Sequence, residues 1–271
     1  MNYAINSTDE NDTYSFFLPI VNHLWSKIGY YPVSILVGEE ALWKTNLVYK
    51  YVQDTSKVVF IKPVEGFRRS TTAQTSRVIV AASALFNPTD YLLTSDADML
   101  PLNKKFYNDQ CGTKDIHLMN ADAYTDITKG WEPIRFPICH IGATVATWRE
   151  VMTLTSTDVQ AEVQKAMIGR ADIWNNDEEY FTGRLKGSRF YKERCQMMVR
   201  GGFAEYSRAK DRLDRENWWF NGTQRNYLDC HFPRPGFDHL DKLRLLISTY
   251  FPDTVTYINA YITDFMKGRR K

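Results

Sequence analysis

The chain has 271 residues, with 34 Lys and Arg against 32 Asp and Glu and a net charge of +2. This length supports a full hydrophobic core, and the even charge balance excludes a strongly basic nucleic-acid-binding domain. With 44% hydrophobic residues, the chain is also not a disordered one. No apolar run approaches the about 18 residues of a membrane span, and the polar first residues are unlike a secretory signal.

Cysteine usage points to a reducing compartment. The four cysteines are far apart and form no Cys-X-X-Cys pair. Reduced thiols in the cytosol are the usual state for such a pattern. We therefore expect a soluble, cytoplasmic protein with these free thiols: Cys111, Cys139, Cys195 and Cys230.

The first hundred residues alternate short β-branched runs with longer stretches of helical spacing. This alternation is typical of an α/β fold, with a mainly parallel sheet flanked by helices. Strands are predicted at 3–6, 33–37, 57–61 and 91–94. Helices are predicted at 14–28, 41–52 and 73–86, and Pro19 indicates a late start or a kink in the first.

The pattern is looser after residue 105. Strands are expected at 115–120 and 135–146, and further helices at 147–153, 177–185, 240–250 and 255–266. No internal repeat or Pro-, Gly- or Ser-rich linker divides the chain, which favours one domain over 1–271.

Two carboxylates follow the fourth predicted strand, in Asp96-Ala97-Asp98. Ligands of open α/β sheets bind beyond the carboxyl ends of the strands. Carboxylates at i and i+2 of an extended segment point the same way, so both could face one hard divalent cation. Asp-X-Asp is also a frequent turn sequence without function, but an apolar strand leading into it, followed by Pro101, is much less common.

This segment resembles the aspartate-any-aspartate motif of the GT-A fold glycosyltransferases, the nucleotide-diphospho-sugar transferases. The resemblance implies a Rossmann-like GT-A fold in which Mn²⁺ or Mg²⁺ is held against the donor diphosphate. Asp98 would ligate the metal, and Asp96 would contact the donor ribose or reach the metal through water. Residues 1–105 would form the nucleotide-sugar-binding half, and 106–271 the acceptor-binding half with the C-terminal helices.

Further segments resemble the donor side of the same family. Gln74 to Arg77 leads into an apolar helix and is similar to the family's Ala-Arg-Asn helix start, although no Asn follows Arg77. The first strand and its loop would cradle the base, or alternatively would only cap the next helix. The residues expected at the donor are Ser7, Thr8, Asp9, Arg77, Ser95, Asp96, Ala97 and Arg234.

Two segments are candidates for contacting the acceptor. Residues 142–150 are similar to the family's glycine-led segment that ends in Arg-Glu, although Gly142 could instead serve close passage of the backbone. Trp219, in the pair Trp218-Trp219, could form a sugar platform or pack in the core.

The acidic segment 175–185 resembles the family's glutamate-aspartate helix, which ends in Arg-Leu. Counting back from Arg184-Leu185 places Glu178 on the base of inverting members, with Asp177 before it and the two acid types exchanged. A helix cap is the structural alternative. A positioned carboxylate that takes the acceptor proton contributes about 10²- to 10⁴-fold in rate.

A late histidine and arginine complete the expected site. His231 matches the further metal ligand that GT-A enzymes commonly provide, and imidazole favours Mn²⁺ over Mg²⁺. Arg234 has the forked donors that suit diphosphate oxygens.

The sequence therefore predicts a metal-dependent glycosyltransferase that moves a sugar from a UDP- or GDP-linked donor to a hydroxyl of a glycan or other acceptor, with inversion. A sugar nucleotidyltransferase is one alternative, but the loop after the first strand is acidic and not glycine-rich. A non-catalytic carbohydrate-binding protein is another. The basic tail 267–271 behind an apolar stripe suggests either a solvated helix end or contact with an anionic membrane surface.

Overall fold

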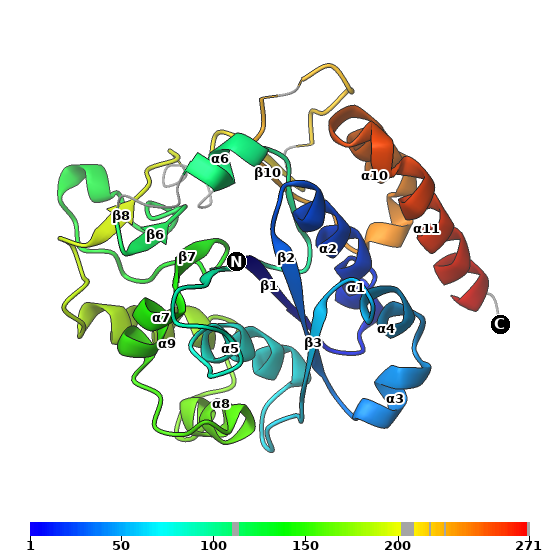
Figure 1. Cartoon of the computed structure of the whole chain (residues 1–271). Coiled ribbons are helices and arrows are strands. Elements are labelled where there is room, and N and C mark those ends of the chain that lie inside the picture. The colour runs from blue at the N-terminus through cyan, green and yellow to red at the C-terminus, as the bar shows by residue number, and fades with distance from the viewer. Residues whose placement is uncertain (110–113, 202–208, 217, 225, 270–271) are drawn as a thin grey trace.

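A computed structural model describes residues 1–109, 114–201, 209–216, 218–224 and 226–269. Its centre is a sheet with the strand order β3-β2-β1-β4-β7-β6-β8 (Figure 1). The strands are β1 (Asn2–Thr8), β2 (Tyr31–Val37), β3 (Lys57–Ile61), β4 (Tyr91–Thr94), β6 (Ile116–Leu118), β7 (Ile141–Thr144) and β8 (Cys195–Met197).

The mainly parallel sheet predicted from the sequence is confirmed. β1 runs parallel to both β2 and β4, and β2 parallel to β3, whereas β7 is antiparallel to its neighbours β4 and β6. The predicted strand 135–146 is too long, because Thr144 ends β7 and caps the next helix, α7 (Val145–Met152). Its hydroxyl accepts a hydrogen bond from the Thr147 backbone N–H at 3.3 Å.

A small second sheet joins distant parts of the chain. It contains β5 (Met99–Pro101), β9 (Arg212–Asp214) and β10 (Asp229–His231), with β10 in the middle. β10 pairs antiparallel with β5, so His231 lies opposite Met99, one residue after Asp98.

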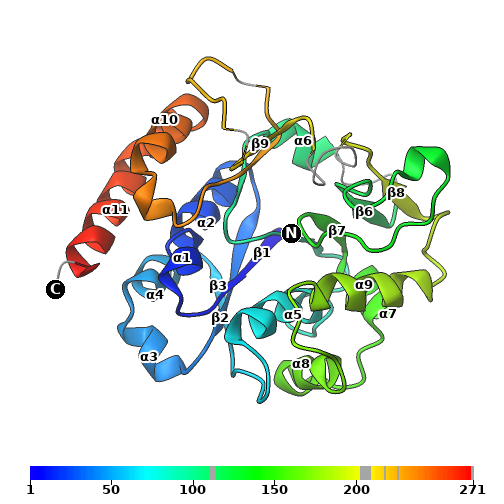
Figure 2. The ribbon, with the colours of Figure 1, turned by 180° about the vertical axis from the view of Figure 1, so that it is seen from behind.

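Helices cover both faces of the large sheet (Figures 1 and 2). One face carries α2 (Leu18–Lys27) and α4 (Leu47–Val52), with α10 (Leu240–Tyr250) and α11 (Val255–Arg269) beside them. The other carries α5 (Arg69–Ala81), α7, α8 (Val159–Met167) and α9 (Asn176–Lys186). Short helices complete the chain: α1 (Asp12–Ser15), α3 (Glu40–Thr45) and α6 (Lys104–Asp109).

Two predicted helices are broken where the sequence supplies an interrupting residue. The predicted helix 14–28 divides into α1 and α2, and Pro19 lies in the first turn of α2, where no N–H partner is needed. The predicted helix 41–52 divides into α3 and α4 at Asn46, whose side chain accepts from the Val48 N–H at 2.8 Å. The helix predicted at 73–86 begins earlier, as α5. The helices predicted from residues 240 and 255 begin at those residues, as α10 and α11.

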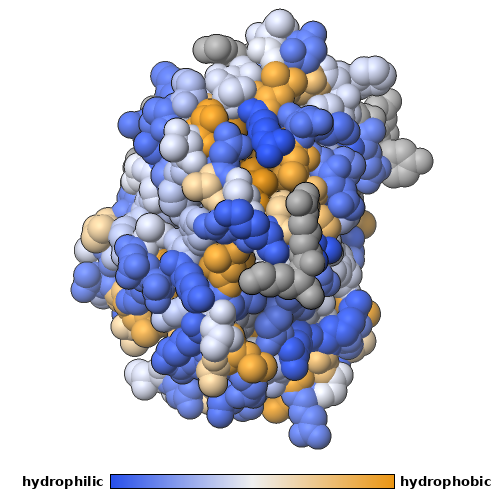
Figure 3. All heavy atoms as spheres, turned by 90° about the vertical axis from the view of Figure 1, so that its right-hand side faces the viewer, coloured by the Kyte–Doolittle hydropathy of each residue, from blue (hydrophilic) through white to orange (hydrophobic). Residues whose placement is uncertain are grey.

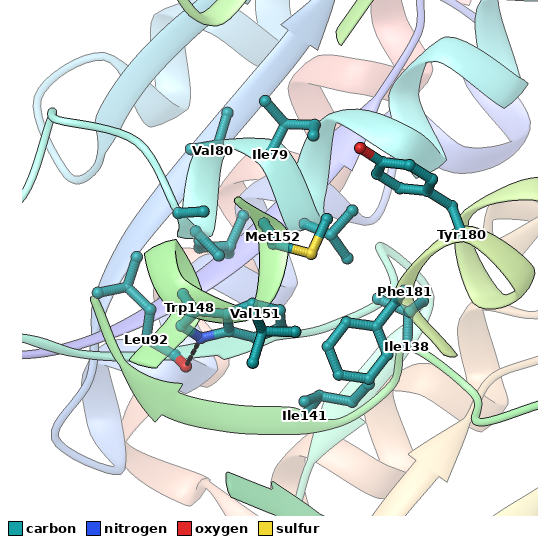
Figure 4. Packing of buried hydrophobic residues seen from close by; sticks show 14 of the residues in the cluster. Ile79, Val80, Leu92, Ile138, Ile141, Trp148, Val151, Met152, Tyr180 and Phe181 are labelled. Atoms are coloured by element: carbon teal, nitrogen blue, oxygen red, sulfur yellow. Dashed lines mark hydrogen bonds between the residues drawn. The ribbon is translucent and has the colours of Figure 1, made fainter. Parts of the chain in front are cut away.

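The core on the α5 face packs aliphatic side chains together with the rings of Trp148 and Phe181 (Figure 4). Trp148 of α7 packs against Phe181 of α9, with ring centroids 5.4 Å apart. Its indole Nε1 donates to the Leu92 carbonyl of β4 at 3.1 Å, so the one polar atom of this side chain is satisfied. This core therefore fixes α9, and the acids at its start, relative to the centre of the sheet.

The apolar side chains of α11 are buried in the core on the α2 face. Ile258, Tyr261, Ile262 and Phe265 are buried, and the Tyr261 hydroxyl donates to the Phe16 carbonyl at 2.9 Å. These side chains thus pack inside the protein and cannot meet a membrane, which corrects that part of the predicted contact. The surface on this side is mostly hydrophilic, with separate hydrophobic patches (Figure 3).

The basic tail is also engaged with the protein where it is described. Arg269 forms an ion pair with Asp12, and its guanidinium lies 3.9 Å from the Phe237 ring centroid. Arg270 and Lys271 lie outside the described residues. In the described part of the chain, no helix has the length and hydrophobicity needed to cross a membrane. Cys139, Cys195 and Cys230 are buried free thiols, and Cys111 lies outside the described residues.

The order of the strands reverses between β1 and β4, which makes this position a topological switch point of the sheet. β2 extends the sheet on one side of β1 and β4 on the other, and the Ser95 N–H donates to the Ile5 carbonyl at 2.9 Å. The carboxyl ends of β1 and β4 are therefore neighbours. Ligands of open α/β sheets bind at this position.

Candidate active site

A cleft of about 350 Å³ opens at the carboxyl ends of β1 and β4. This volume lies within the range of small-molecule sites. Seven carboxyl side chains but only four arginines line it, which leaves an excess of negative charge. The carboxyl groups are those of Asp9, Asp96, Asp98, Asp177, Glu178, Asp214 and Glu216, and the arginines are Arg77, Arg212, Arg215 and Arg234.

The two aspartates after β4 both line the cleft, but in a turn and not in the extended segment expected. The Met99 N–H donates to the Asp96 carbonyl at 3.1 Å, closing the turn around Ala97, which also lines the cleft. Because the backbone turns between them, Asp96 and Asp98 have different ion-pair partners among the described residues.

Asp98 lies among nitrogen donors. Its Oδ2 is 3.3 Å from His231 Nε2, 3.2 Å from Arg234 Nε and 3.4 Å from Arg215 Nη1. Burial opposes ionisation of this carboxyl group, but His231 and Arg234 outweigh it and lower the pKa of Asp98. The Asp98 carboxylate is therefore ionised, and positively charged side chains surround it.

His231 lies between Arg215 and the carboxylates of Asp98 and Asp214. Its Nε2 lies 2.8 Å from Arg215 Nη1, and its Nδ1 is 3.5 Å from Asp214 Oδ2. Burial opposes protonation of His231, but Asp98 and Asp214 outweigh it and raise the pKa of the imidazole. Nε2 of His231 and Oδ2 of Asp98 lie 3.3 Å apart, and Nε2 becomes available as a metal ligand when the imidazole gives up its proton.

These residues fit a divalent metal held together with a ligand. Across the described residues, no three His, Cys, Asp or Glu side chains form a preassembled metal cluster. Asp98 and His231 nevertheless supply one oxygen and one nitrogen within 3.3 Å of each other, in a cleft with excess negative charge. Small divalent cations are commonly held by one or two side chains plus substrate phosphates, so two protein ligands suffice.

Arg77 joins the two acidic segments of the cleft. Its Nη2 donates to Asp177 Oδ2 at 2.8 Å, and its Nη1 donates to Asp96 and, at 3.0 Å, to the Ser95 carbonyl. Arg77 lines the cleft as predicted, but these internal bonds occupy its guanidinium. Ser95 is fully buried and does not line the cleft.

Asp177 and Glu178, at the start of α9, both line the cleft. Burial raises the pKa of Asp177, although Arg77 opposes this. Burial, with the nearby Asp177 charge, raises the pKa of Glu178 to about 8. A carboxyl group that changes charge near neutral pH inside a cleft is a candidate for proton transfer.

The loop after β1 lines the cleft and also caps the next helix. Ser7, Thr8 and Asp9 line the cleft, and burial raises the pKa of Asp9. Asn11 in the same loop caps α1, because its side chain accepts from the Thr13 N–H at 2.9 Å.

Two predicted acceptor residues are not in the cleft. Gly142 lies in β7, where a Cβ atom would overlap the Tyr91 hydroxyl, so close packing accounts for this glycine. The Trp219 side chain is 78% exposed but absent from the cleft lining. Its neighbour Trp218 packs against Phe232, with ring centroids 5.2 Å apart.

Several cleft residues had no clear signal in the sequence. Trp174, 46% exposed, lies at the cleft and near Tyr14, with ring centroids 6.2 Å apart. The one indication in the sequence that Trp174 lies near the site is its position directly before the acidic segment 175–185. Arg215 and Tyr124 come from segments without a recognisable motif, and only the fold brings them here.

No protein-family model matches the chain, and no curated protein sequence is significantly similar to it. Solved glycosyltransferase structures are similar in fold. An active-site mutant of LgtC shares 12% identity over 86% of this chain and 87% of its own, with a TM-score of 0.46. A Drosophila β1,4-galactosyltransferase 7 mutant, in complex with manganese, UDP-Gal and xylobiose, shares 11% identity over 56% of this chain and 52% of its own, with a TM-score of 0.33.

The glycosyltransferase GlyE of Streptococcus pneumoniae shares 10% identity over 73% of this chain and 46% of its own, with a TM-score of 0.39. Because the TM-scores are low, the functional conclusions rest on this chain's own residues.

Proposed function

We propose that this protein is a metal-dependent glycosyltransferase that moves a sugar from a UDP- or GDP-linked donor to a hydroxyl group of an acceptor, with inversion. One observation carries the proposal. The Asp98–His231 pair and the candidate proton acceptor Glu178 line the same cleft, at the switch point of the sheet. A metal-binding end and a proton-accepting end are the two parts that such a transfer needs.

The donor end is formed by Asp98 and His231, which would hold Mn²⁺ or Mg²⁺, with Asp96 beside them. A bound divalent cation would stabilise the negative charge that grows on the leaving diphosphate. Arg215 and Arg234 surround Asp98, and their forked donors suit diphosphate oxygens. Ser7, Thr8 and Asp9 supply polar groups for the nucleoside on the β1 side.

The acceptor end is formed by Glu178, with Trp174 at the edge of the cleft. The Glu178 carboxylate would take the proton from the acceptor hydroxyl as the new bond to the sugar forms. Because its pKa is about 8, the basic form of Glu178 increases as the pH rises through neutrality. The transfer rate is therefore expected to rise over the same interval and then level off.

Calorimetry with sugar nucleotides tests the donor end. We expect UDP- or GDP-sugars to bind more tightly when Mn²⁺ is present, and Asp98→Asn to remove that enhancement. Asp115→Asn is a matched control, because Asp115 pairs with Arg194 outside the cleft. An unchanged Mn²⁺-dependent affinity in Asp98→Asn would refute the assignment.

Product analysis separates transfer from the related alternatives. A glycosyltransferase releases a nucleoside diphosphate from the sugar nucleotide when an acceptor is present. Release of pyrophosphate from a nucleoside triphosphate would instead identify a nucleotidyltransferase, and sugar binding that ignores the nucleotide would identify a carbohydrate-binding protein.

A further inference from the structure

Each carboxylate oxygen of Glu178 contacts a different residue, and both of these residues lie between β6 and β7. The Tyr124 hydroxyl donates to Oε1 at 2.9 Å, and Arg135 Nε forms an ion pair with Oε2 at 3.0 Å. Both partners belong to the loop region between β6 and β7, whereas Glu178 belongs to α9. The carboxylate is thus held from outside its own helix at two points.

The two partners also hold each other. The Arg135 guanidinium lies 4.2 Å from the centroid of the Tyr124 ring. The Asn175 amide, with its oxygen turned toward Arg135, accepts from Nη1 at 3.3 Å and from Nη2 at 3.2 Å. Tyr124, Arg135 and Glu178 therefore make three mutual contacts, and Asn175 anchors the arginine to the start of α9.

We propose that Tyr124 and Arg135 are positioning residues that clamp the carboxylate of Glu178 and stabilise its ionised form in the cleft. The physical reason lies in their chemistry. Arg135 carries a positive charge and the Tyr124 hydroxyl donates a hydrogen bond, so both contacts are stronger with a carboxylate than with a protonated carboxyl group. The catalytic consequence of the clamp rests on the proposed function, but the clamp itself does not.

Other charges around Glu178 act in the opposite direction. Asp177 precedes it on α9, and Asp96 faces it from the turn after β4. Arg77 of α5 is bonded to both of these aspartates. Burial and the acidic neighbours raise the pKa of Glu178 to about 8, while Tyr124 and Arg135 lower it. Loss of either clamp residue should therefore move the ionisation to still higher pH.

A titration followed by ¹³C NMR tests this without any substrate. Protein labelled at glutamate carboxyl carbons would be titrated from pH 5 to pH 10, and the resonance missing from Glu178→Gln identifies Glu178. We expect Tyr124→Phe and Arg135→Gln each to raise the midpoint by about half a pH unit or more, because each removes a contact that favours the charged form.

Matched controls remove the same kinds of group elsewhere. Tyr191 donates to Glu132 at 2.6 Å and Arg189 to Glu150 at 2.8 Å, both outside the cleft, so Tyr191→Phe and Arg189→Gln should leave the Glu178 midpoint unchanged. Arg135→Lys keeps the positive charge and should recover most of the shift seen in Arg135→Gln. Unchanged midpoints in both Tyr124→Phe and Arg135→Gln would overturn the clamp.

A failure of the clamp proposal and a failure of the proposed function would give different results. The titration reports on the clamp whether or not any transfer activity is found. If transfer is found, the midpoint of its pH–rate profile should equal the Glu178 titration midpoint of the same protein. It should therefore be higher in Tyr124→Phe than in the wild type. A shifted titration with an unshifted rate profile would confirm the clamp and overturn the assignment of Glu178 as proton acceptor.

Discussion

Arg77 donates a hydrogen bond to Asp177 at 2.8 Å, and both side chains are almost completely buried. The same guanidinium bonds to Asp96, so one arginine connects the helix α5 to both acidic segments of the cleft. The relationship is structural as well as electrostatic, because it ties the turn that holds Asp96 to the start of α9, the two segments to which we assign metal binding and proton transfer.

Replacing this arginine should destabilise the fold strongly. Arg77→Met leaves the buried Asp177 carboxylate without its cation, and breaking a buried pair in this way costs about 3–5 kcal/mol. Urea unfolding measures the loss. Arg68→Met is the control, because Arg68 pairs with Asp172 at the surface and should cost less than about 1 kcal/mol. A similar small loss in both variants would contradict the bridging role.

Stability should depend on pH through Glu178. This group ionises near pH 8 in the folded protein, against an ordinary value of 4.5, so the folded state binds the extra proton. The free energy of unfolding therefore falls as the pH rises from 5 to 8, by a few kcal/mol at most, since one pKa unit corresponds to about 1.4 kcal/mol. Urea unfolding at both pH values should show a smaller decrease in Glu178→Gln; an equal decrease would contradict the raised pKa.

Arg215 should compete with the metal. Its guanidinium lies 2.8 Å from His231 Nε2 and 3.4 Å from Asp98 Oδ2, the atoms assigned to the cation. In Arg215→Gln we expect Mn²⁺ alone to bind about tenfold more tightly, equivalent to about 1.4 kcal/mol, by calorimetry. Nucleoside diphosphate binding should weaken in the same variant, because a donor to the phosphates is lost.

Arg194→Gln is the control for that experiment, since Arg194 pairs with Asp115 away from the cleft. Unchanged or weaker Mn²⁺ binding in Arg215→Gln would show that the arginine does not occupy the metal position.

Gly142 should matter for packing and not for the acceptor. In Gly142→Ala the new methyl group would overlap the Tyr91 hydroxyl, and overpacking of this kind costs about 1–3 kcal/mol. Thermal unfolding should show the loss, while the KM for the acceptor stays at the wild-type value. A raised KM at unchanged stability would restore the acceptor role suggested by the sequence.

The exposed side chains of Trp174 and Trp219 should behave differently. Trp174 lines the cleft and Trp219 does not. Steady-state kinetics with sugar acceptors should show a KM raised about fivefold in Trp174→Ala, from the loss of roughly 1 kcal/mol of stacking. Trp219→Ala should match the wild type, and the reverse outcome would place the acceptor elsewhere.

The sequence alone determined the class of fold and located two of the acids that line the cleft. The alternation of strands and helices follows local periodicity, which is why the mainly parallel sheet and the last two helices were predicted. Asp96 and Asp98 were found because a buried strand must end at the edge of a sheet, and a ligand site lies at that edge.

Only the tertiary structure decided how the acids are partnered. Arg77, Tyr124 and Arg215 reach them from segments 19, 54 and 117 residues away in the chain, through contacts that no local pattern encodes. The same long-range packing assigned Gly142 to the sheet and left Trp219 outside the cleft. Side-chain pairing depends on which surfaces meet after folding, and periodicity within a segment does not contain that information.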